Sequence, residues 1–438
     1  MEVARTYGGF VKRRLETDPA KAASLIRFGL HAESFRTGHL PDKEMPNAYR
    51  YLNHMAIAEV TEALEHPESF VWGNIFAPVE IFQALGLSCV SVECMSSYLS
   101  GFWIEDSLVD ACEAAGFPAT LCSYHKAFLG AAVDGILPTP AAAVTTSMIC
   151  DANFNTFRAV GQMCGVPTVF LDVPYRWNEE NRDYLVGQLE SLVSRLEALT
   201  EKRLDRDALS EALVRENKSK EHYWSFLQKR KKHAYPETLT LRLFTIFATH
   251  LSVGSPWALK FFEMLDSEID EYPADEAKRI FWVHLTPYAE PSLSAAFNYS
   301  DRIGIVADDL NLDYMEPLDA DHPFEALAKK MICNIYNGGF ERKVDAIARY
   351  VREFECEGAI EFCHWGCKQS CGGVQLIKER LREIGVPLLA IDGDGVDRRN
   401  NQDGQIKTRL EAFLELLDRE ESSEGQGDSR IVRESVSA

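Results

Sequence analysis

The chain has 438 residues, 46% of them hydrophobic and 11% aromatic, so it is long enough for two or three domains with ample cores. Its formal net charge of −21 argues against a nucleic-acid partner, which would require a basic surface. The sequence contains neither an apolar run of the roughly 18 residues that span a bilayer nor a signal-peptide core near its start, so we expect a cytoplasmic protein without a membrane partner.

Residues 1–64 are predicted to form an N-terminal helical segment with a break at residues 38–41. Residues 65–177 then alternate apolar strand-like runs with helical patterns, which is typical of a parallel sheet covered on both faces. We call this segment the first α/β unit. Its strands are expected at residues 70–76, 87–92, 142–146 and 167–172.

Residues 178–272 are charged and rich in Leu, Glu, Lys and Arg, and they are predicted to form an α-helical connector. One helical stripe of this connector consists of Leu185, Leu189, Leu192, Leu196 and Leu199.

Residues 273–418 return to the strand and helix alternation and are predicted to form a second α/β unit. Its strands are expected at residues 280–284, 303–307, 358–362 and 387–391. The fold class is therefore α/β, with two similar four-stranded parallel-sheet units. The polar residues 419–438 are expected to be a disordered tail.

The segment FCHWGCKQSCGG at residues 362–373 places Cys363, Cys367 and Cys371 at a spacing of four, directly after an expected strand. Thiolates are soft ligands that suit zinc or an iron–sulfur cluster. The spacing differs from that of common zinc modules, which argues against a zinc site that also uses His364. If the run were helical, the three thiols would lie on one face, about 6 Å apart along the axis.

Two further cysteines have comparable surroundings. Cys150 follows an expected strand and begins a helix, and Cys122 precedes the segment SYHK. Because loops from both α/β units can meet in one cleft, Cys122, Cys150 and Cys367 are candidates to hold a [4Fe–4S] cluster with one open iron. We expect five other cysteines to be buried core residues: Cys89, Cys112, Cys164, Cys333 and Cys356.

A family resemblance is carried by MICD at residues 148–151, WGCK at 365–368 and the C-terminal series GVP, DGD, GQ and TRLEAF between residues 385 and 413. Over residues 65–418 the chain resembles the 2-hydroxyacyl-CoA dehydratase / benzoyl-CoA reductase family, of the 2-hydroxyglutaryl-CoA dehydratase D-component type. The resemblance implies two flavodoxin- or Rossmann-like units and assigns the cluster ligands to Cys122, Cys150 and Cys367. It also implies a catalytic carboxylate at Glu93. Ile75 stands where some members of the family have a serine.

The resemblance further implies an anaerobic radical mechanism. An ATP-dependent iron–sulfur activator protein supplies one electron at low potential, a ketyl radical forms on the 2-hydroxyacyl-CoA, and hydroxide leaves to give the enoyl-CoA. Glu93 would then transfer the proton that becomes acidic only in the radical. A homologous second subunit or a second copy of the chain is expected as a partner.

Three more thiols leave alternatives open. Cys94 adjoins Glu93, while Cys363 and Cys371 flank Cys367, so six thiols are available for a double-cubane [8Fe–9S] cluster like that of a homodimeric branch of the superfamily that reduces small molecules. For these three residues, a ligand role and a buried structural role are both open. A third alternative is a non-catalytic electron-transfer subunit.

Polar neighbours of the site complete the sequence-based expectations. His125 and His364 adjoin candidate ligands and are expected to donate hydrogen bonds to them. The segment at residues 392–394 is interpreted as a turn. Four cations are available for the phosphates of CoA, and the sequence does not choose among Lys126, Arg158, Lys368 and Arg409.

Overall fold

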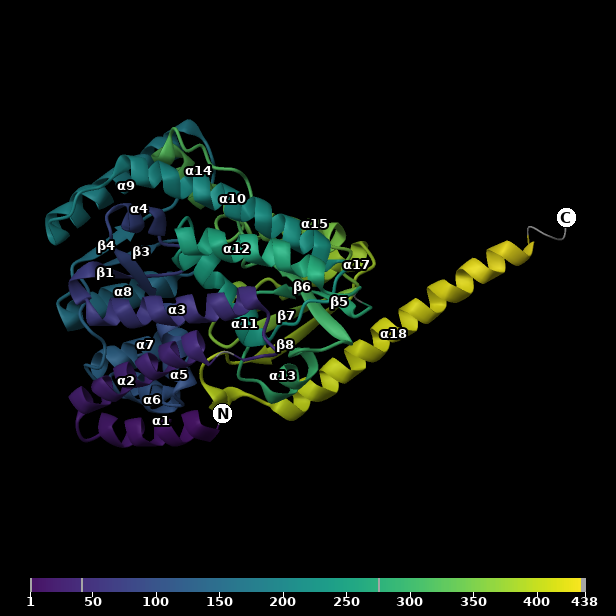
Figure 1. Cartoon of the computed structure of the whole chain (residues 1–438), viewed down its shortest axis with the longest axis horizontal. Helices are drawn as coiled ribbons and strands as arrows, with labels where there is room; N and C mark the ends of the chain where they lie inside the picture. The colour runs from purple at the N-terminus through teal and green to yellow at the C-terminus, as the bar shows by residue number, and fades with distance from the viewer. Residues whose placement is uncertain (1, 41, 275, 435–438) are drawn as a thin grey trace.

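Two four-stranded parallel sheets organise the chain, which is described here from a computed structural model covering residues 2–40, 42–274 and 276–434 (Figure 1). In the first sheet, the spatial order is β2-β1-β3-β4, and every neighbouring pair is parallel. Its strands are β1 (Phe70–Gly73), β2 (Ser88–Ser91), β3 (Ala142–Thr146) and β4 (Thr168–Leu171). β1 is shorter than the expected strand at 70–76, because the chain turns at residues 74–76.

The second sheet repeats this arrangement, in the order β6-β5-β7-β8. Its strands are β5 (Lys278–Val283), β6 (Ile303–Asp308), β7 (Gly358–His364) and β8 (Leu388–Gly393). The prediction of two similar parallel units is thus confirmed. In both sheets the chain moves from the first strand to one side and then to the other, which creates a switch point beside that strand. Open α/β sheets bind ligands at the carboxyl ends of the strands at such points.

The burial of the strands matches their places in the two sheets. Of the four interior strands, β1, β3 and β7 are buried along their whole length and β5 along its last four residues, as expected for parallel strands covered by helices on both faces. The edge strand β8 alternates between buried and more exposed positions.

The first unit and the N-terminal segment consist otherwise of helices. Asp18 caps the second helix, because its side chain accepts a hydrogen bond from the Lys21 N–H. The sequence did not predict this break between the first two helices, whereas the break expected at residues 38–41 coincides with the end of the second one. The helices are α1 (Glu2–Leu15), α2 (Pro19–His39), α3 (Asn47–Glu65), α4 (Val79–Ala84), α5 (Val92–Gly101), α6 (Glu105–Ala114), α7 (Ser123–Val133) and α8 (Asp151–Cys164).

The connector is helical, as expected, and it contacts both units. Its helices are α9 (Glu179–Thr200), α10 (Arg206–Arg230), α11 (Leu239–Ile246) and α12 (Pro256–Glu268), with a π-helical turn at Phe247–Leu251 after α11. The leucine stripe of α9 is buried except for Leu199, which is 42% exposed at the end of the helix.

A buried ion network joins the connector to both units. The Lys330 ammonium, on α14 (Pro323–Cys333) of the second unit, lies 2.7 Å from the Glu80 carboxylate on α4 and 2.8 Å from the Glu216 carboxylate on α10. Lys220 also pairs with Glu216, at 2.9 Å. Because both carboxylates are almost completely buried, each depends on these ammonium groups for charge compensation.

The second unit ends in a long helix. α18 (Asp403–Glu434) begins against α13 (Pro291–Phe297) and β8 and then extends away from the body of the protein (Figure 1). The tail expected at 419–438 is therefore helical as far as Glu434, where the charged sequence contains no proline to end the helix; residues 435–438 lie outside the described part. The other helices are α13 (Pro291–Phe297), α14 (Pro323–Cys333), α15 (Phe340–Glu353), α16 (Lys368–Cys371) and α17 (Val374–Glu383). No helix within the described ranges is long and apolar enough to cross a membrane.

Candidate functional site

A cavity of about 470 Å³ lies where the carboxyl ends of the two sheets face each other. Ile75 follows β1 and Cys150 follows β3, so both come from the switch point of the first sheet. His284 follows β5 and Cys367 follows β7, so both come from the switch point of the second sheet. The fold therefore places two ligand-binding edges around one space, which we call the cysteine cavity.

The three cysteines predicted to converge all line the cysteine cavity. Each is the N-cap residue of a helix: Cys122 precedes α7, Cys150 precedes α8 and Cys367 precedes the short helix α16. The partial positive charge at a helix N-terminus favours negative charge on a nearby sulfur. The sequence indicated this helix-start position for Cys150. It gave no such signal for Cys122, whose preceding segment is a loop rather than a strand.

Each of these cysteines also has an imidazole nitrogen beside its sulfur. The Nε2 atom lies 3.2 Å from the sulfur for His364 and Cys122, 3.9 Å for His125 and Cys150, and 3.6 Å for His284 and Cys367. His125 and His364 were expected near ligands, whereas His284 was not expected. Its position directly after the strand at 280–284 was the available signal.

The hydrogen bonds of His364 define which of its ring nitrogens carries the proton. The Gly395 N–H donates to Nδ1 at 3.0 Å, so Nε2 carries the hydrogen and donates it to the Cys122 sulfur. Burial lowers the pKa of His364, which keeps the ring neutral. This ring therefore presents a fixed N–H donor to the sulfur.

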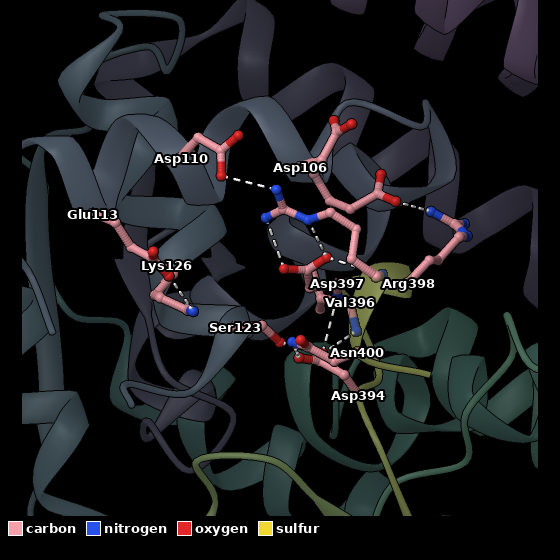
Figure 2. A network of polar contacts seen from close by, with 12 residues as sticks. Asp106, Asp110, Glu113, Ser123, Lys126, Asp394, Val396, Asp397, Arg398 and Asn400 are labelled. Atoms are coloured by element: carbon pink, nitrogen blue, oxygen red, sulfur yellow. Dashed lines mark hydrogen bonds and ion pairs between the residues drawn. The ribbon is translucent and has the colours of Figure 1, made fainter. Parts of the chain in front are cut away.

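Asp394 organises the loop beneath His364. It accepts hydrogen bonds from the Ser123 hydroxyl and from the backbone N–H groups of Val396 and Asp397 (Figure 2). Asn400 donates to its second oxygen at 2.9 Å. The carboxylate is thus fully used in shaping the turn that ties the second unit to the start of α7. The turn interpretation for residues 392–394 is correct only for Asp394, because Asp392 and Gly393 pair with β7 as the last residues of strand β8.

Several residues around the cysteine cavity have backbone conformations with positive φ angles. Ile149 and His284 have positive φ angles, 65° and 71°, which are costly for side chains with a Cβ atom. Gly366 has φ 78°, and a Cβ atom there would lie only 2.7 Å from the Cys122 backbone nitrogen. This position requires glycine because the loop holding Cys367 passes so close to Cys122.

Burial controls the charge state of the three thiols. It raises the pKa of Cys150 to about 12, and it raises the pKa values of Cys122 and Cys367 as well. The nearby sulfurs of Cys367 and Cys150 add to the rise of the Cys122 pKa. Such thiols become thiolates only when a cation compensates them, as a bound metal does.

The arrangement of these thiols suits a cluster better than a single metal ion. Over residues 2–40, 42–274 and 276–434, no group of three His, Cys, Asp or Glu side chains is placed to hold one ion. In an iron–sulfur cluster each thiolate binds a different iron, so the sulfurs surround a space rather than converge on a point. Three cysteines around one cavity, Cys122 buried and Cys150 and Cys367 partly buried, fit that requirement.

Cys94, Cys363 and Cys371 are not among the described residues that line the cysteine cavity. Cys363 lies on β7 and Cys371 on α16. The alternative in which residues 363–371 form one helix is therefore wrong, because β7 continues through His364 and the chain turns between His364 and α16. The thiols of Cys363 and Cys371 are hydrogen-bonded to each other, and this bond lowers the pKa of Cys371 to about 7. A ligand role for these three cysteines stays a prediction.

Glu93 lies in the first turn of α5, just after β2, and also lines the cysteine cavity. Burial raises its pKa to about 7, whereas hydrogen bonds from its own backbone, from Ser91 and from the Ile75 backbone oppose the rise. Its Oε2 atom is buried and has no hydrogen-bond partner in the described part of the chain. A carboxylate oxygen is thus available beside the cysteines.

A second, larger cavity of about 820 Å³ adjoins the first, and we call it the apolar cavity. The two cavities share the lining residues Ile75, Glu93, Tyr124 and Leu285. Cys94 lines the apolar cavity only.

Of the four cations considered for CoA phosphates, Lys368 lines the cysteine cavity and is exposed. Lys126 is buried and pairs with Glu113 at 2.7 Å (Figure 2). Arg409 pairs with Asp392 at 3.4 Å, and Arg158 lies exposed on α8. The structure therefore favours Lys368 as the cation nearest the cavity.

Comparison with known proteins gives consistent similarities. A family model described as 2-hydroxyglutaryl-CoA dehydratase, D-component, matches residues 74–417. The (R)-phenyllactyl-CoA dehydratase alpha subunit of Clostridium sporogenes is 24% identical over 88% of this chain and 98% of its own length. One of the subunits of benzoyl-CoA reductase from Thauera aromatica is 23% identical over 72% of this chain and 80% of its own length. The beta chain of (R)-2-hydroxyglutaryl-CoA dehydratase from Acidaminococcus fermentans is 25% identical over 63% of this chain and 75% of its own length.

Proposed function

The chain belongs to the 2-hydroxyglutaryl-CoA dehydratase D-component family, and we propose that it is a subunit of an enzyme that dehydrates a 2-hydroxyacyl-CoA to an enoyl-CoA. The observation that carries this proposal is the presence of three N-cap cysteines, contributed by both α/β units, around one cavity. The relatives that are dehydratase subunits support the reaction class.

The cofactor proposed for this cavity is a [4Fe–4S] cluster on Cys122, Cys150 and Cys367. When bound, such a cluster would supply low-potential electron transfer and a Lewis-acidic iron for the departing hydroxyl group. The three imidazoles lie beside the sulfurs, and the His364 N–H donates to Cys122. Such hydrogen bonds stabilise negative charge on the sulfurs and fix their orientation.

Glu93 is proposed to receive the proton that leaves C3 of the substrate. Its unpartnered Oε2 lies on the wall shared by the two cavities, and the Ile75 backbone helps to orient the carboxylate. Since Ile75 itself offers no hydroxyl group, the step would not depend on a side chain at that position. Buried apolar neighbours keep water away from the transferred proton.

The proposed enzyme requires partners. One is an ATP-dependent iron–sulfur activator protein that delivers the electron. The other is a homologous second subunit, and the similarity of this chain to both an alpha and a beta dehydratase chain supports that arrangement. A double-cubane reductase would need Cys94, Cys363 and Cys371 as further ligands, and their positions outside the cysteine cavity favour the single-cluster proposal.

Measuring the iron and acid-labile sulfide content per chain tests whether the protein binds the proposed cluster. Protein purified without oxygen should contain about four irons per chain. Replacing Cys122, Cys150 or Cys367 with serine should sharply lower that number, while Cys356→Ser, a change at a buried cysteine elsewhere, should preserve it. Circular dichroism would verify that each variant is folded. Absence of iron after reconstitution, or equal iron in all four variants, would rule out the proposed cluster.

Activity tests the reaction. The iron-loaded protein, combined with an activator and a partner subunit from a known dehydratase system, should form enoyl-CoA from a 2-hydroxyacyl-CoA. Glu93→Gln should abolish turnover while leaving the iron content unchanged. Turnover by that variant at the wild-type rate would remove Glu93 from the mechanism.

A further inference from the structure

The apolar cavity is built by the N-terminal helices together with α5 and α11. Figure 1 shows α1 and α2 beside α5, and aromatic side chains from all four helices line the space. These side chains are Tyr7, Phe28, Tyr98, Phe102, Phe244 and, from the turn after α11, Phe247. Such a lining binds apolar groups by removing their surface from water.

The hydroxyl groups of three tyrosines in this lining are already used within the protein. Tyr7 donates to the Leu25 carbonyl at 2.8 Å, Tyr98 donates to the Ala56 carbonyl at 3.2 Å, and Tyr288 donates to the Ser97 carbonyl at 3.2 Å. These three rings therefore contribute apolar surface to the cavity, with their hydroxyl groups engaged elsewhere. A polar ligand group there would lose its hydrogen bonds to water with little replacement.

The charges of the lining do not suit an anionic ligand either. The only lysine or arginine among the described lining residues is Arg36, which is bound to Glu33 through two of its nitrogens, one of them at 2.8 Å. The third charged residue is Glu93, on the wall shared with the cysteine cavity. A carboxylate placed in the apolar cavity would thus lack a free cation and would face acidic side chains.

Polar atoms without partners are instead found on the shared wall. Glu93 Oε2 and the Tyr124 hydroxyl are both buried and have no hydrogen-bond partner among the described residues. Both residues line the two cavities. The shared wall, where reacting atoms would lie, therefore carries free polar groups, and the rest of the apolar cavity is mainly apolar.

We propose that the apolar cavity holds the acyl side chain of the substrate, and that this side chain is a bulky apolar group, aryl or branched alkyl, rather than a carboxylate-bearing chain. This inference rests on the proposed function. The pantetheine arm of CoA contains two amides that need hydrogen-bond partners, and the mostly aromatic and aliphatic walls offer few of them, chiefly Asn53 and Thr240. The arm therefore leaves through the cysteine cavity, where Lys368 lies.

Binding of thioesters without turnover tests the proposal. We would measure the affinity of the iron-loaded protein for three compounds by calorimetry: free CoA, a 2-hydroxyacyl-CoA with a phenyl side chain, and one with a terminal carboxylate. The phenyl compound should bind at least about tenfold more tightly than either of the others, because burial of an aromatic ring strengthens binding by that order.

Two variants locate the effect. Leu243→Arg introduces a cation into the cavity wall and should reverse the preference between the phenyl and carboxylate compounds, whereas Leu376→Arg, on the exposed face of α17, should not. Gly101→Leu adds a side chain to the lining where a Cβ atom meets nothing within 4 Å. It should weaken binding of the phenyl compound about tenfold or more without changing the affinity for free CoA. Gly187→Leu, equally free of contacts on α9, is its control.

The outcomes separate this inference from the proposed function. Equal or tighter binding of the carboxylate compound to the wild-type protein would overturn the apolar specificity alone. An equal loss of free CoA affinity in Gly101→Leu would show that the cavity holds the CoA arm instead. If iron-loaded protein bound none of the three compounds, the proposed function would fall, and this inference with it.

Discussion

Lys330→Met tests whether the buried ion network holds the two units and the connector together. The substitution keeps an unbranched side chain that lacks only the ammonium position, and it leaves the carboxylates of Glu80 and Glu216, which are 2% and 1% exposed, without their shared cation. Breaking a buried ion pair by removing one partner costs about 3–5 kcal/mol. For a chain of this size, the melting temperature should fall by roughly 3–5 °C.

The pH dependence identifies the cause. In the wild type, burial alone would raise the pKa of Glu216, but Lys220 and Lys330 hold it at about 2, while burial raises the pKa of Glu80. Without Lys330 both folded-state pKa values move upward. A buried carboxyl group with a raised folded-state pKa is neutral at low pH, where it does not destabilise the folded protein. It becomes charged as pH rises through that pKa, and the folded protein then loses stability. The loss of stability should therefore be larger at pH 8 than at pH 5.

Thermal unfolding followed by circular dichroism at both pH values measures the effect. The control is Lys329→Met, because the neighbouring Lys329 is 43% exposed and pairs with the exposed Glu316. An exposed pair contributes about 0–1 kcal/mol, so this control should melt close to the wild type at either pH. Equal melting temperatures for the two variants, or a Lys330→Met effect that is the same at pH 5 and pH 8, would refute the reasoning.

Three further predictions concern the cysteine cavity. Gly366→Ala should lose iron because its Cβ atom would lie 2.7 Å from Cys122, whereas Gly385→Ala, with a similar positive φ but no contact within 4 Å, should bind iron normally; iron analysis of the two folded variants decides. His364→Phe should lower the reduction potential of the bound cluster by about 20–60 mV, the equivalent of one hydrogen bond, and a potential unchanged in a spectroscopic titration would contradict the role of its N–H group. Reconstitution with iron and sulfide should raise the melting temperature of the wild type but not of Cys122→Ser, since a ligand that binds only the folded state stabilises it; an equal rise in both would place the iron elsewhere.

The parallel sheets were predictable because each strand is a short apolar run bounded by helical patterns. The helical connector was predictable from its leucine stripe. Residues 419–434 were misjudged because a polar composition alone does not distinguish an exposed helix from a disordered segment. The end of β1 was also misplaced, since the apolar residues Ile75 and Phe76 are buried in a turn rather than in a strand.

The site was predictable to the extent that its residues follow strands. Cys150 and Cys367 occupy such positions, and their meeting follows from the doubly repeated sheet order. His284 has the same kind of position but was missed, because a single histidine carries no spacing signal. The apolar cavity could not be foreseen, since helices far apart in sequence contribute its walls.

The division of the cysteine cavity between two units constrains how the protein matures. Cys122 and Cys150 leave the ribosome more than two hundred residues before Cys367, with the whole connector synthesised in between. A nascent first unit displays two of the three thiols next to helix N-termini and lacks the third. A cofactor that requires all three can therefore be inserted only after the second unit has been made and docked. Under the proposed function, Cys122 and Cys150 must stay reduced and vacant while the more than two hundred residues between Cys150 and Cys367 are synthesised.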